Sequence, residues 1–112
     1  MPGVELLSRS EELLLLAVWR LQDDAYGAAI RDYLSRETGE DWSVGAVYAP
    51  LDRLARRGLL RSWMGEPTPE RGGRAKRYFK LTTAGVAALS RLRSIQEKMW
   101  SGLPALNLQP SR

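Results

Sequence analysis

Hydrophobic positions recur at helical spacing through the first third of the chain. Ser10, followed by two glutamates, is typical of a helix start and predicts a first helix over residues 10–22. A second helix is predicted from Tyr26 or Gly27 up to Gly39, because glycine supplies a C-terminal stop. The apolar positions expected to face a core are Leu13, Leu16, Ala17 and Leu21 in the first helix, and Ile30, Tyr33 and Leu34 in the second.

A third helix is predicted to begin after Ser43, whose hydroxyl can cap it, and to end at Gly58. Its apolar positions repeat every three or four residues and predict one buried stripe of Val44, Val47, Leu51 and Leu54. Pro50 falls inside this helix, where proline removes a backbone hydrogen bond and clashes with the preceding turn. We therefore expect a kink or irregular first turns.

Two short strands are predicted next, over residues 59–65 and 76–81. The segment between them, residues 66–75, is rich in Pro, Gly and Arg and is typical of a loop. The pair predicts a β-hairpin with a long tip, which is the shape of a wing.

Thr82 or Thr83 can cap a final helix that is long for a small domain. Its apolar residues also recur at spacings of three or four: Val86, Leu89, Leu92, Ile95 and Met99. Such a stripe exceeds what a small core needs, so we expect part of it to pack against another chain. Residues 101–112 are expected to form a loose tail.

The predicted fold is mainly α with a small β-hairpin, in the order of a winged helix-turn-helix domain with a long C-terminal dimerisation helix. We divide the chain into a DNA-binding domain (1–81), a dimerisation helix (82–103) and a flexible tail (104–112). In this architecture the third helix, at about 43–57, enters the major groove of DNA. The wing, at about 66–76, meets the DNA backbone.

Composition excludes several classes of chemistry. The chain has neither cysteine nor histidine, which excludes disulfides, thiolate or imidazole metal ligands, cysteine nucleophiles and a histidine base. We predict no enzyme activity, no metal and no cofactor. The N-terminus lacks the pattern of a secretory signal and the leucine run is too short to cross a bilayer, so we expect a cytoplasmic protein without a membrane partner.

Charge is distributed unevenly along the chain. The net charge is +4, but residues 53–80 hold nine basic and two acidic side chains, or +7, which leaves −3 for the rest. A basic segment that coincides with the third helix and the wing favours a polyanionic partner, and we predict double-stranded DNA.

The candidate DNA contacts come from the third helix and the wing. The first turns of the helix carry small residues that allow close approach to a groove, and hydroxyls that can donate to DNA. The candidates are Ser43, Gly45, Ala46, Tyr48 and Arg53 in the helix, and Arg71, Arg74, Lys76 and Arg77 around the wing. Two alternatives stay open: Tyr48 can be a core aromatic with glycine and alanine as mere filler, and the wing can be an ordinary solvated hairpin.

Several passages together resemble the PadR family of bacterial regulators, especially its short members. They are the leucine-rich first helix, YG at 26–27, WSVGAVY at 42–48, LDRL at 51–54, GLL at 58–60 and RYFKLT at 77–82. The resemblance covers roughly residues 10–103. It implies a homodimer with interlocked first and last helices, bound to a palindromic operator, with repression as the commoner role. It also implies that the contacts fall on Ser43, Gly45, Ala46, Tyr48 and Arg53, and on Arg74 and Lys76 in the wing.

Some members of that family sense small aromatic compounds at the dimer interface. The residues that could form such an effector site are Trp19, Leu92, Ile95, Met99 and Trp100. Aromatic and Met side chains at helical spacing more often fill packing space, so we favour their role as dimer core. A second functional alternative is a winged-helix module that docks an acidic protein on its basic face.

Overall fold

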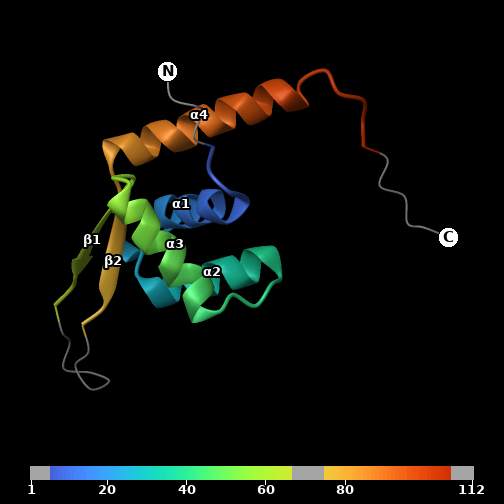
Figure 1. Ribbon diagram of the computed structural model, residues 1–112. Helices are drawn as coiled ribbons and strands as arrows, with labels where there is room; N and C mark the ends of the chain where they lie inside the picture. The colour runs from blue at the N-terminus through green and yellow to red at the C-terminus, as the bar shows by residue number, and fades with distance from the viewer. Residues whose placement is uncertain (1–5, 67–74, 107–112) are drawn as a thin grey trace.

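The computed structural model describes residues 6–66 and 75–106. In chain order the elements are α1 (Arg9–Leu21), the 3-10 turn η1 (Gln22–Asp24), α2 (Gly27–Thr38), α3 (Val44–Arg56), β1 (Leu60–Met64), β2 (Arg77–Leu81) and α4 (Thr83–Trp100). The fold is therefore mainly helical with one antiparallel hairpin, in the predicted order, and each predicted element is present (Figure 1).

The core is built around α1, which packs against α2, α3 and β2 (Figure 1). Its most buried side chains are Leu14, Leu15, Ala17 and Val18. The predicted stripe was partly wrong, because Leu16 is 44% exposed. A run of four leucines contains no polar position that would distinguish the inner from the outer side of the helix, so periodicity alone could not orient it.

The helix α3 buries Val47, Pro50, Leu51 and Leu54. Val44, predicted in the same stripe, is 55% exposed because it is the first residue of the helix and lies beyond the core. The irregular first turns expected from Pro50 are not observed, since the α-helix is continuous. The carbonyl that loses its partner belongs to Ala46, an exposed residue, where water can replace the missing amide.

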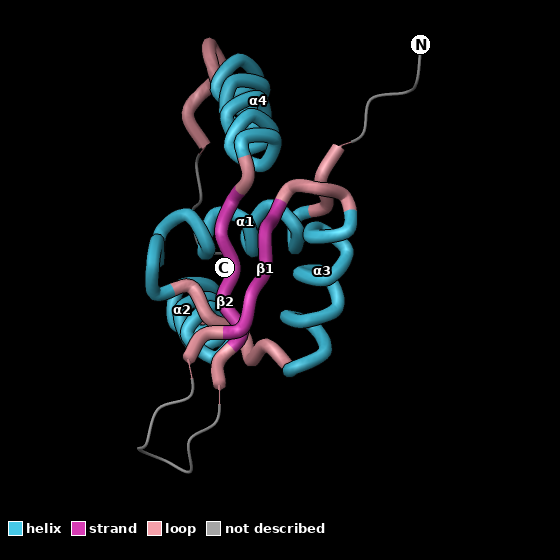
Figure 2. Tube along the Cα trace, turned by 90° about the vertical axis from the view of Figure 1, so that its left-hand side faces the viewer, coloured by secondary structure: helices cyan, strands magenta, loops and turns pink. Residues whose placement is uncertain are grey.

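The hairpin covers one side of the helical core (Figure 2). β1 pairs with β2 in antiparallel register, with Leu60 opposite Leu81 and Met64 opposite Arg77. A third segment joins the far edge of β2, where the Phe79 amide donates to the Ala25 carbonyl at 2.8 Å. Seen from this side, α3 and α2 flank the hairpin, and α4 lies above it and is viewed nearly along its axis.

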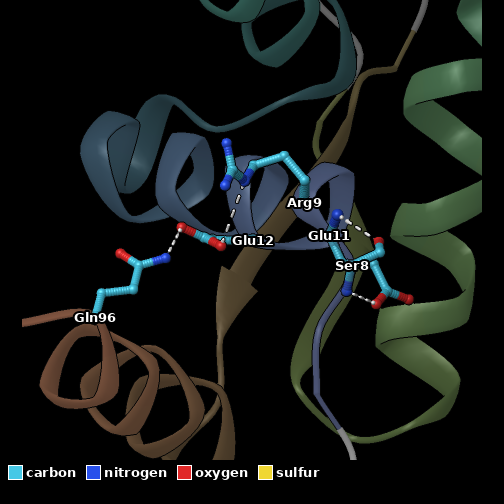
Figure 3. A network of polar contacts seen from close by, with 5 residues as sticks. All are labelled: Ser8, Arg9, Glu11, Glu12 and Gln96. Atoms are coloured by element: carbon cyan, nitrogen blue, oxygen red, sulfur yellow. Dashed lines mark hydrogen bonds and ion pairs between the residues drawn. The ribbon is translucent and has the colours of Figure 1, made fainter. Parts of the chain in front are cut away.

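The first helix begins at Arg9, one residue earlier than predicted. Its N-cap is Ser8, not Ser10, because Ser8 and Glu11 form a capping box (Figure 3). The Ser8 hydroxyl accepts from the Glu11 amide at 3.1 Å, and the Ser8 amide donates to the Glu11 carboxylate at 2.9 Å. Glu12, on the next position, accepts from the Gln96 side chain at 3.0 Å and so ties α1 to α4.

The helix α4 leaves the hairpin at a tight junction. The Thr82 hydroxyl caps the helix by accepting from the Gly85 amide at 3.0 Å, and it donates to the Gly58 carbonyl at 2.6 Å. A Cβ at Gly85 would lie 2.1 Å from the Leu59 carbonyl oxygen, so only glycine fits there. Gly85 is also the one buried residue among the 18 of this helix.

We expect Gly85→Ala to lower the free energy of unfolding by about 1–3 kcal/mol, because the added methyl group overpacks the junction against backbone. Gly45→Ala is the control: nothing lies within 4 Å of a Cβ at Gly45, so stability should stay or rise by up to about 1 kcal/mol. Urea unfolding followed by circular dichroism measures both at one protein concentration. Equal stability of Gly85→Ala and the parent chain would contradict this junction.

Candidate nucleic-acid interface

The first turn of α3 is capped and open to solvent. Ser43 is the N-cap, and its hydroxyl accepts from the Ala46 amide at 3.1 Å. Ser43, Val44, Gly45 and Ala46 are all exposed, and a Cβ on Gly45 would meet no atom within 4 Å. The turn therefore presents small side chains and the positive end of a helix dipole to whatever approaches it.

The loop before this turn is fastened to α2 through Trp42. The Trp42 indole donates to the Thr38 hydroxyl at 3.0 Å, and Arg31 donates to the Trp42 carbonyl at 2.5 Å. Ser43 comes directly after Trp42, so these bonds fix where α3 begins. Sequence reasoning used Trp42 only as part of a family resemblance, and no pattern signalled the partners on α2.

Tyr48 lies between α2 and α3 rather than fully on the open face. It is half-buried and packs on the edge of the core. A Cβ on Gly27 would fall 1.6 Å from the Tyr48 hydroxyl oxygen, so the glycine at the start of α2 makes room for this ring. The structure thus places Tyr48 at the rim of the candidate surface, with its ring committed to packing.

The arginines in and around α3 fall into two groups, those exposed to solvent and those paired with a carboxylate. Arg53 and Arg56 are exposed on the face opposite the core. Arg57, the residue after the helix, pairs with the Glu11 carboxylate at 3.4 Å and so joins the end of α3 to the start of α1. Arg77, predicted as a wing contact, pairs with Asp52 of α3 at 2.7 Å and donates to the Ser62 hydroxyl at 2.7 Å.

The base of the wing carries a row of aromatic and cationic side chains across the outer face of the hairpin. The Lys76 ammonium lies 4.2 Å from the Tyr26 ring centroid, and Tyr26 meets Tyr78 edge-on at 5.6 Å. Tyr78 stacks on Trp63 at 5.9 Å, and the Arg61 guanidinium lies over Trp63 at 5.2 Å. This row, which sequence reasoning missed, rigidifies the strands. The candidates Arg71 and Arg74 lie outside the described residues.

Other classes of site find little support. In the described parts of the chain, no three acidic residues gather as a metal site would require. No helix within residues 6–66 and 75–106 is long and apolar enough to cross a membrane.

The family can be assigned from sequence. The model of the transcriptional regulator PadR-like family matches residues 15–91. The chain belongs to this family. Its members are DNA-binding transcription regulators and not enzymes, so the predicted class and the absence of enzyme activity are confirmed. No curated protein is similar enough in sequence to count as a relative.

Solved structures agree with the winged-helix fold of this PadR-like regulator. A PadR-like transcription factor from Bacteroides fragilis is 26% identical, with a TM-score of 0.65 over 81% of this chain and 85% of that one. RosR from H. salinarum is 22% identical, with a TM-score of 0.69 over 88% and 81% of the two chains. A transcriptional regulator from Clostridium thermocellum is 19% identical, with a TM-score of 0.65 over 84% and 91%.

The residues suggested for an effector site do not share one cavity within a single chain of this PadR-like regulator. Trp19 borders a hollow of about 230 Å³ between α1 and α4. Leu92 and Ile95 border a different hollow of about 310 Å³, and Met99 and Trp100 a third. All five line surfaces beside α4, which is where a second chain would have to cover them.

We expect Ser43→Ala to lower the free energy of unfolding by about 1 kcal/mol, because the Ala46 amide loses its capping acceptor. Ser43→Asp keeps an acceptor and a favourable charge at the helix N-terminus, so its stability should match the parent chain. Thermal unfolding of the three proteins makes the comparison. A Ser43→Asp protein as unstable as Ser43→Ala would contradict the capping role.

Proposed function

We propose that this PadR-like regulator is a homodimeric repressor of a palindromic operator. One α3 enters the major groove of each half-site, and one wing lies on the backbone beside it. The observation that carries the proposal is the bare, capped first turn of α3, held beside exposed arginines and a cation-rich hairpin.

Base contacts are assigned to the first turn. Gly45 has no side chain to keep the backbone away from base edges, and the exposed methyl groups of Val44 and Ala46 suit the methyl group of thymine. Ser43 adds a hydroxyl at the same end of the helix. Tyr48 contributes a contact from the rim, through the part of its half-buried side chain that is open to solvent.

Phosphate contacts are assigned to exposed cations on both sides of this turn. Arg53 projects from the second half of α3, and Lys76 stands at the base of the wing on the Tyr26 ring. Arg71 and Arg74, which lie outside the described residues, add two positive charges to the sequence between the strands. Together these charges make binding depend on salt, because each phosphate neutralised releases counterions.

The dimer is assigned to α4, consistent with the domain division at residues 81 and 82. Apolar side chains lie on both sides of its contact with α1: Leu92 and Ile95 border one hollow, Val86 and Leu89 the other. Met99 and Trp100 remain 72% and 60% exposed at its end. A second copy that covers this surface would bury apolar area at about 25 cal/mol per Å² and set the spacing of the two α3 helices.

Repression follows if the occupied operator overlaps a promoter, and such a protein acts in the cytoplasm where the DNA is. The test is fluorescence anisotropy on labelled DNA from the upstream region of its own gene, beside a scrambled duplex, at several salt concentrations. Tight binding that the scrambled duplex does not show supports the proposal. Equal weak binding to both duplexes overturns it and favours the module that docks an acidic protein.

We expect Arg53→Ala to weaken operator binding and to reduce its salt slope by about one, because the phosphate contact of an exposed guanidinium is lost. Arg9→Ala is the control, since the Arg9 side chain is 78% exposed on α1, where it pairs with Glu12 at 3.9 Å, and is not part of the proposed DNA surface. The same anisotropy titration measures both variants. Equal losses in the two would mean that overall charge, and not the α3 surface, controls binding.

We expect Leu92→Asp to dissociate the dimer, because a carboxylate placed in the apolar surface beside α4 would be buried without a partner, at a cost of about 3 kcal/mol or more. Ser94→Asp adds the same charge at an exposed position of α4 and should leave the dimer intact. Sedimentation velocity gives the oligomeric state, and circular dichroism verifies the fold. A Leu92→Asp protein that remains dimeric would exclude this interface.

A further inference from the structure

One guanidinium joins three elements near the outer end of the hairpin. Arg77 of β2 pairs through Nη1 with the Asp52 carboxylate of α3 at 2.7 Å, and through Nε it donates to Ser62 of β1 at 2.7 Å. Its carbon lies 5.0 Å from the Phe79 ring centroid, so the planar group also covers the edge of the core. Both charged side chains are only partly exposed, at 36% and 41%.

The Arg77–Asp52 pair lies at the end of the hairpin where apolar packing is weakest. At the end near α4 the strands are fastened by the buried residues Leu60 and Leu81, but at the wing end Arg77 stands opposite Met64, which is 60% exposed. The inward-facing side chains of the two strands are therefore less buried toward the wing. At that end of the hairpin, the contacts of Arg77 with Asp52 and Ser62 link the strands to α3.

The pair also changes the charge of the face that carries Arg53. An unpaired carboxylate at Asp52 would repel phosphates next to that arginine. If Arg77 turned away to bind a phosphate, it would uncover this carboxylate and give up its hydrogen bond to Ser62. Two of its donors are already committed, in a fork whose geometry lysine cannot reproduce.

We propose that Arg77 and Asp52 are positioning residues, a polar strut that holds the strands β1 and β2 at a fixed angle to α3 so that hairpin and helix reach the DNA as one unit. The proposal rests on the proposed function and assigns Arg77 a different role from the phosphate contact expected from sequence. Loss of the strut would let the described end of the hairpin, at Met64 and Arg77, move relative to the helix. Contacts in the groove and on the backbone would then no longer match one spacing.

Asp52→Asn gives a test in which the two roles predict opposite results. If Asp52 were only an acidic side chain near DNA, its removal would raise operator affinity and leave the preference for operator over scrambled duplex unchanged. With a strut, the freed positive charge raises binding to the scrambled duplex while operator binding falls. We expect the operator preference, measured by anisotropy, to drop roughly tenfold.

Arg77→Lys and Arg77→Ala complete the set. A phosphate contact would survive as lysine, and alanine would reduce the salt slope by about one. The strut predicts that both variants lose operator preference to a similar extent, that the salt slope is kept, and that Asp52→Asn combined with Arg77→Ala is no worse than either alone. Additive losses, or full activity of Arg77→Lys, would overturn the proposal.

Hydrogen exchange on the DNA-free protein separates this proposal from the function on which it rests. We expect Arg77→Ala to speed amide exchange in β1 and β2 while the core of α1 keeps the parent rates, which also shows that the variant folds. Unchanged exchange in the strands would overturn the strut. If the parent chain prefers no operator but the strands still loosen, then the proposed function fails and the strut stands.

Discussion

The structure depends on α3 being held firmly while half of its surface stays bare. Its buried face, Val47, Pro50, Leu51 and Leu54, packs on the core, but hydrophobic contact alone lets a helix slide or rotate. Directional polar contacts fix it at three points along its length. Trp42 fastens its start to α2, Asp52 ties its middle to the hairpin, and Arg57 joins its end to α1 through Glu11.

The small size of the core explains why α4 leaves apolar side chains exposed. A domain of this size has one core, and α1 already fills its centre, so a further amphipathic helix has little left to bury against. The junction at Gly85 and the bond between Glu12 and Gln96 hold α4 in place without covering its apolar side chains. A helix so positioned and so exposed is suited to a second copy of the chain, and its rigid junction would pass the dimer spacing on to α3.

Sequence patterns predicted the elements well because local signals are strong: glycine stops, capping hydroxyls and the apolar period of α3. They failed where the answer depends on what surrounds an element. The leucine run of α1 does not indicate which side of the helix faces the core. Val44 has the spacing of a buried position in α3, but it lies at the end of the helix, beyond the core. The role of Trp42 in fastening the start of α3 could not be predicted either, because its partner Arg31 is eleven residues away in sequence and becomes adjacent only after folding.

Charge counting shows a related limit. The segment 53–80 carries +7, which indicated a nucleic-acid surface, but that sum treats every cation as available. Folding commits Arg57 to Glu11 and Arg77 to Asp52, and in each case the acid lies outside or at the border of the segment that was counted. The side chains that we propose for phosphates are those that project from the solvent side, such as Arg53 and Lys76. The basic residues of such a domain therefore include some that can bind phosphate and some that hold the fold together. The carboxylates with which they pair distinguish the second group from the first.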